Sequence, residues 1–229
     1  MKIYYRTSES GYNKVKLPFV NNENCLKNFC KRFQSHIDDI IVIADGIGEN
    51  TQKIIEQYVN KNNILNVRMG NGAATFNYAL DLALKHDDEE IVYFVENDYL
   101  HREESEKVLC EAFELGTQFC TLYDHLDKYF DGPNPYVQDG GEETKVFLSK
   151  SCHWKFTNST TMTFAGKVKY LKQFESTFRK YTSTSHPHDF HMWIEIRNLG
   201  GSLMSPIPGY STHGDLPTVA PLINWEKQL

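Results

Sequence analysis

The stretch Glu90-Ile91-Val92-Tyr93-Phe94-Val95-Glu96-Asn97-Asp98-Tyr99 determines how the rest of the chain is interpreted. The apolar run 91–95 predicts a strand that is buried on both faces of a sheet. The strand ends at two carboxylates, Glu96 and Asp98, where open α/β sheets bind their ligands. Carboxylates at this spacing can hold a hard divalent cation, Mg²⁺ or Mn²⁺, beside a phosphate. The alternative is a solvated turn, because Asn and Asp are common turn formers.

Three earlier segments also read as strands that end in polar turns. They are residues 2–7, 39–44 and 66–69, and helical patterns follow each of them. This order of strand, turn and helix is a βαβ series. It predicts an α/β fold in which helices flank both faces of a mixed, mostly parallel sheet.

The polar turns carry side chains that suit a nucleotide. Arg6 and Thr7 follow the first strand and can form the floor of a nucleotide pocket, or only a turn. Asp45 can accept a hydrogen bond from a base or a ribose hydroxyl, or it is a turn residue before glycine. Arg68 and Asn71 flank a glycine-rich entry to a helix, whose free N–H groups can bind a phosphate.

The second half of the chain is less regular. Residues 124–143 have no periodicity, which is typical of a functional lid or a disordered loop. Short strands are predicted at 144–148, 161–164 and 202–206, and helices at 167–181 and 190–199. Asp189 would lie at the amino end of that last helix, where Asp is also a common cap.

Composition restricts the classes of function. The chain has 229 residues and a formal net charge of −6, which disfavours nucleic acid as a partner. Its five cysteines are odd in number and form no Cys-x-x-Cys pair, which favours free thiols in a reducing compartment and hence a cytoplasmic protein. We see no signal peptide and no apolar run near the roughly 18 residues of a membrane span.

The order of these motifs resembles the GT-A glycosyltransferases, family 2 in particular. In the first half, the resemblance rests on three features. They are the strand ending in Asp45-Gly46, the turn and helix start at 71–77, and Glu96-Asn97-Asp98 in the place of Asp-x-Asp. His188-Asp189, in the place of Glu-Asp, and a late His213 carry it in the second. Glu96 and His188 depart from the family pattern, and the resemblance then implies Asp98 as the direct metal ligand of the acidic turn.

The resemblance implies a single GT-A (Rossmann-like) domain over 1–229, with a nucleotide-sugar-binding half, 1–123, and an acceptor-binding and catalytic half, 124–229. It implies an inverting transfer of a sugar from a nucleotide-diphosphate sugar, with UDP favoured, to an acceptor hydroxyl on a glycan. Asp98 and His213 would bind Mn²⁺ or Mg²⁺, and Asp189 would be the general base. The cofactor-binding residues would be Arg6, Thr7, Asp45, Arg68, Asn71, Glu96 and Asn97.

Other interpretations stay open from the sequence. A sugar nucleotidyltransferase shares the sheet and the acidic metal site, but usually has a glycine-rich loop with Lys or Arg after strand one, and Thr7 to Gly11 lacks that pattern. A non-catalytic nucleotide- or sugar-binding module is a second alternative. His186, His188 and His191 with Asp189 can instead form a separate metal site.

Overall fold

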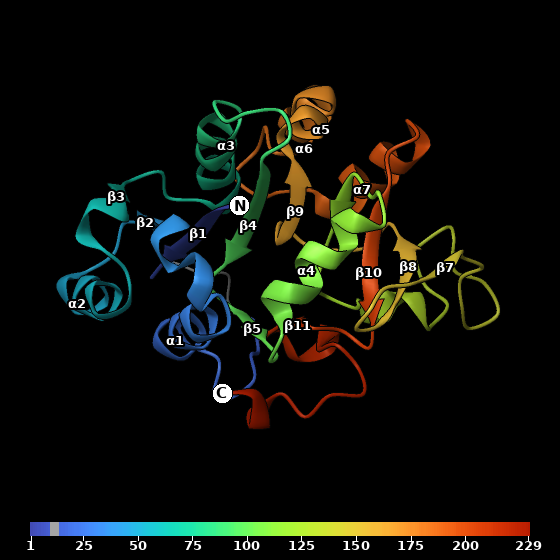
Figure 1. The fold of residues 1–229 in the computed structure, drawn as a ribbon, viewed down its shortest axis with the longest axis horizontal. Coiled ribbons are helices and arrows are strands. Elements are labelled where there is room, and N and C mark those ends of the chain that lie inside the picture. Colours follow the sequence, from blue (N-terminus) through green and yellow to red (C-terminus); the bar gives the residue numbers. More distant parts are fainter. Residues whose placement is uncertain (10–13) are drawn as a thin grey trace.

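The structure is a computed structural model, and it describes residues 1–9 and 14–229. Across the described residues, one mixed sheet of nine strands forms the centre of the molecule (Figure 1). Its strands lie in the order β3 (Ile64–Val67), β2 (Ile40–Asp45), β1 (Lys2–Ser8), β4 (Ile91–Glu96), β9 (Phe164–Lys167), β6 (Phe119–Cys120), β10 (Leu203–Ile207), β8 (His153–Thr157) and β7 (Val146–Leu148).

The two halves of this sheet differ in strand direction. β3, β2, β1 and β4 are parallel neighbours, as the repeated strand-turn-helix order predicts. β9 runs antiparallel to both β4 and β6, and β8 is antiparallel to β10 and β7. The predicted mixed, mostly parallel sheet with helices on both faces is therefore confirmed.

Helices cover both faces because the strand side chains alternate between them. Ile3 and Tyr5 of β1 belong to one core, whereas Tyr4 belongs to the other. The first core is covered by α1 (Asn22–Arg32), α2 (Glu49–Tyr58) and α4 (Ser105–Glu114). The second is covered by α3 (Gly72–Ala83), α5 (Val168–Gln173), α6 (Glu175–Tyr181) and α7 (Asp189–Asn198).

The fold differs from the sequence prediction in several places. Strand β8 was not predicted, and the strand predicted at 161–164 lies at 164–167 as β9. The helix predicted at 167–181 is two helices, α5 and α6. They meet at Phe174, whose side chain is buried and whose backbone is not helical. A small second sheet, β5 (Tyr99–His101) with β11 (Ser211–His213), was not predicted. Both strands are buried throughout, so neither shows the alternation that identifies a strand in the sequence.

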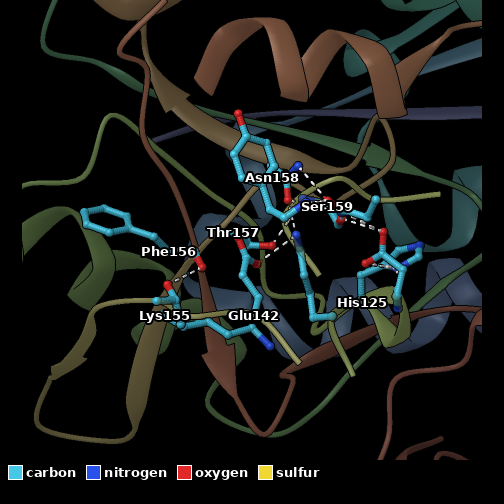
Figure 2. A network of polar contacts seen from close by, with 12 residues as sticks. His125, Glu142, Lys155, Phe156, Thr157, Asn158 and Ser159 are labelled. Atoms are coloured by element: carbon cyan, nitrogen blue, oxygen red, sulfur yellow. Dashed lines mark hydrogen bonds and ion pairs between the residues drawn. The ribbon is translucent and has the colours of Figure 1, made fainter. Parts of the chain in front are cut away.

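The irregular segment 124–143 is held in place by a buried polar network (Figure 2). Asn158 and Ser159 lie among side chains of this segment, whereas the Phe156 ring points away from the network. The Lys128 ammonium lies 2.9 Å from Glu142 Oε2, and both side chains are almost fully buried. The Asn134 amide donates to Asn158 and Ser159. The segment is thus an ordered part of the domain rather than a disordered loop.

Candidate active site

A cavity of about 410 Å³ opens where the parallel strands end. The register of the sheet explains its lining, because Arg6 of β1 is level with Glu96 of β4, and Ser8 is level with Asp45 of β2. Every predicted site residue except Arg68 lines this cavity: Arg6, Thr7, Asp45, Asn71, Glu96, Asn97, Asp98, Asp189 and His213. Arg68 lines a shallower neighbouring hollow with Asp45 and Gly46.

The most charged part of the cavity is centred on Asp98. One oxygen, Oδ2, lies 2.9 Å from Lys16 Nζ and 3.2 Å from His213 Nε2. Burial alone would raise the pKa of Asp98, but the His213 hydrogen bond and the two cations outweigh it, so that pKa lies below its usual range. Burial likewise opposes the charged form of His213, and the bond to Asp98 raises its pKa. Asp98 is therefore held ionised.

The small β5–β11 sheet brings these two residues together. His213 is paired in register with Tyr99, the residue that follows Asp98. The Gly214 N–H donates to the Asp98 backbone oxygen at 2.8 Å. A Cβ on Gly214 would lie 2.6 Å from Val20 Cγ1, so only glycine fits at this crossing. The acidic turn and the late histidine thus meet through backbone pairing.

Arg6 of β1 and Glu96 of β4 form an ion pair in the cavity wall. The buried Arg6 guanidinium donates to the backbone oxygens of Gly72 and Met162 and lies 3.4 Å from Glu96 Oε1. Burial lowers the Arg6 pKa, and the Glu96 charge opposes that shift. Glu96 also accepts from Thr161 Oγ1 at 2.7 Å. Both charged groups are therefore fixed before any ligand arrives.

Two predicted ligand residues already have structural partners. The Asp45 carboxylate accepts from the N–H groups of Met69 and Gly70, which fixes the turn before α3. Asn71 caps α3, because its Oδ1 accepts from the Ala74 N–H at 2.8 Å. Asp45 thus acts as a turn residue, whatever else it binds, and Asn71 satisfies one N–H group, that of Ala74, at the helix entry.

Asp189 lies at the amino end of α7, as the sequence predicted. Its Oδ1 accepts from the Phe190 N–H at 2.8 Å. Burial and, after it, the negative charge of Glu96 raise the Asp189 pKa. A carboxylate with a raised pKa is a better proton acceptor. Asp189 is therefore a cavity carboxylate whose pKa is raised.

Sequence reasoning missed several residues of the cavity wall. Lys14, Lys16, Glu9 and Thr161 line it beside the predicted residues. The alternation Lys14-Val15-Lys16 was the available signal, because alternate residues of an extended segment share one face. Val15 is 70% exposed, whereas both lysines face the cavity.

The alternative histidine metal site is not formed. Among residues 1–9 and 14–229, no group of three or more His, Cys, Asp or Glu side chains is arranged to hold a metal ion. Only His186 and Asp189 of that proposed set line the cavity. Part of the loop Thr7 to Gly11, on which the nucleotidyltransferase alternative depends, lies outside the described residues.

Two of the solved structures that share this fold are the following. One is the crystal structure of GalNAc-T7 with UDP, GalNAc and Mn²⁺, at a TM-score of 0.59 and 11% identity, covering 93% of this chain and 43% of that one. Another is S. aureus TarS 1–349, at 0.51 and 14% identity, covering 90% of this chain and 58% of that one. This chain therefore spans about half the length of these proteins. The class defined by the fold is GT-A.

The sequence match agrees with the fold. Residues 15–178 match the family described as "Glycosyl transferase family 2". The chain belongs to glycosyl transferase family 2, as its motifs indicated. A search of curated proteins gave no match. In the described part of the chain, no helix has the length and apolar character needed to cross a membrane.

Proposed function

We propose that this domain transfers a sugar from a nucleotide-diphosphate sugar, with UDP as the nucleotide, to a hydroxyl group of a glycan acceptor. The observation that supports this most directly is the convergence of Asp98, His213 and Asp189 on one cavity at the carboxyl ends of β1, β2 and β4. Ligands of open α/β sheets bind at that edge. The family membership favours glycosyl transfer over the other chemistries that such a sheet supports.

The residues around Asp98 fit a divalent cation. A hard carboxylate oxygen and an imidazole nitrogen lie 3.2 Å apart and face the same cavity. Mn²⁺ accepts both kinds of ligand, and Mg²⁺ completes its coordination with phosphate oxygens and water. Asp98 and His213 would hold the ion, which would neutralise charge on the departing diphosphate.

The remaining steps fall to side chains of this chain. Asp189 would take the proton from the acceptor hydroxyl as its oxygen forms a bond to the anomeric carbon. The bond from that carbon to the diphosphate breaks, and the electron pair leaves with the nucleotide. Direct displacement of this kind inverts the anomeric carbon. Arg6 and Glu96 would hold the donor, together with Thr7, Asn97 and Asp45 around its ribose and base.

The test is calorimetric titration with UDP, GDP and CDP, each with and without Mn²⁺. We expect UDP to bind tightly only with Mn²⁺, and Asp98→Ala to abolish that dependence. Asp87→Ala is the matched control, because Asp87 is an exposed carboxylate outside the cavity. If no nucleotide binds wild-type protein under any condition, the donor site is wrong. Release of pyrophosphate from a nucleoside triphosphate and a sugar phosphate would instead identify a nucleotidyltransferase.

A further inference from the structure

We infer that Lys16 is a built-in cation that competes with the divalent metal for Asp98 when no donor is bound, and that it moves to the diphosphate when the donor binds. This rests on the proposed function and assigns a role to a residue that the family motifs leave out. It makes metal binding and nucleotide binding mutually dependent through one side chain.

One oxygen atom of Asp98 already has two partners, and one of them is the Lys16 ammonium. Asp98 Oδ2 contacts Lys16 Nζ at 2.9 Å and His213 Nε2 at 3.2 Å. A dication that binds this oxygen would lie within a few ångströms of the Lys16 ammonium, and repulsion between like charges at that range is strong in a partly buried site. The Lys16 ammonium must leave Asp98 before the metal can bind there.

Only the side chain of Lys16 needs to move for this exchange. The backbone of segment 14–17 is paired with segment 214–216, through the Leu17 N–H to Gly214 O at 2.9 Å and the Leu216 N–H to Val15 O at 3.0 Å. Lys16 is 32% exposed and its four-carbon stem is flexible, so the ammonium can change partner while the backbone stays fixed.

The donor supplies the new partner of the Lys16 ammonium. Lys14 and Lys16 both face the cavity, and Lys14 Nζ lies 3.2 Å from Asp215 Oδ2. A diphosphate is an anion, and ammonium groups bind phosphate as point charges. Once it occupies the cavity, its oxygens can accept the Lys16 ammonium, which frees Asp98 Oδ2 for the metal. Metal and nucleotide then raise each other's affinity by the same factor.

The test is a titration of nucleotide-free protein with Mn²⁺ alone, read by calorimetry and by the paramagnetic resonance signal of free Mn²⁺. We expect Lys16→Met to bind Mn²⁺ about tenfold more tightly than wild type, because a competing charge has been removed. In EDTA, the same variant should bind UDP about tenfold more weakly. Lys16→Arg keeps the charge and should behave like wild type in both titrations.

Lys14→Met is the matched control, because Lys14 lies on the same face of the same segment but pairs with Asp215. The Lys14 charge acts on His213 only through space, so this variant should raise the Mn²⁺ affinity less than Lys16→Met does. The difference between the two variants measures the competition at Asp98. Equal Mn²⁺ affinity of wild type and Lys16→Met, including no detectable binding to either, overturns the inference. So does an equal gain in Lys14→Met. Failure of wild-type protein to bind any nucleotide refutes the proposed function instead.

Discussion

The replacement Lys155→Met should be among the most destabilising single changes outside the cavity. Lys155 Nζ lies 2.5 Å from Asp124 Oδ1, and the two side chains are 5% and 0% exposed. Met keeps the length and apolar stem of the side chain but removes its charge. The Asp124 carboxylate would then remain buried with the Tyr129 hydroxyl, which donates to it at 2.8 Å, and no cation.

The expected magnitude follows from this burial. Breaking a buried ion pair from one side costs about 3–5 kcal/mol, because the remaining charge cannot regain its water. With a urea dependence of about 3 kcal/mol per molar for a chain of this size, the unfolding midpoint should fall by about 1–2 M. Lys172→Met is the control, because Lys172 and Asp88 form a pair at 2.6 Å that is 45% and 63% exposed. That pair should contribute at most about 1 kcal/mol.

The assay is urea unfolding followed by circular dichroism on both variants and on Lys155→Met combined with Asp124→Asn. The neutral amide removes the unpaired charge, so the double variant should be more stable than Lys155→Met alone. A loss in Lys155→Met no larger than that in Lys172→Met would refute the argument that this network anchors segment 124–143. A double variant less stable than Lys155→Met would refute the electrostatic explanation.

Two further predictions concern titration and catalysis. Asp189→Asn should lower kcat by at least about a hundredfold while the UDP affinity stays unchanged. Because burial raises the Asp189 pKa, wild-type kcat/KM should begin to fall at a higher pH than it would with an ordinary Asp as the base. An unchanged kcat would remove Asp189 as the base. Burial lowers the pKa of His101 from 6.5 to about 3, so its contribution to stability is complete above pH 6.5 and is lost as the pH falls toward 3. As the pH falls, the free energy of unfolding of wild type should therefore decrease by up to about 1.4 kcal/mol per pH unit more than that of His101→Gln. Urea titrations at several pH values measure this, and an equal pH dependence of the two proteins would contradict it.

The sequence by itself determined the elements of the first half and the chemistry at their ends. Apolar runs such as 91–95 specify a strand through local burial, and the turn residues Asp45 and Asp98 follow directly from where those runs stop. Parallel strands put their carboxyl ends at one edge, so the cavity lined by these residues could be predicted without coordinates. The place of Asp189 at the start of α7 was predictable from the helical pattern that follows it.

Only the tertiary structure decided which side chains of the site contact one another. His213 reaches Asp98 through the pairing of β5 with β11, two short buried strands far apart in the chain whose sequences carry no periodic signal. Lys16 reaches the same oxygen because segment 14–17 pairs with segment 214–216. Asp45 is held by Met69 and Gly70, which a local turn pattern does not foretell. Local hydrophobic order specifies strands and helices, whereas contacts between distant segments depend on the packing of the whole domain.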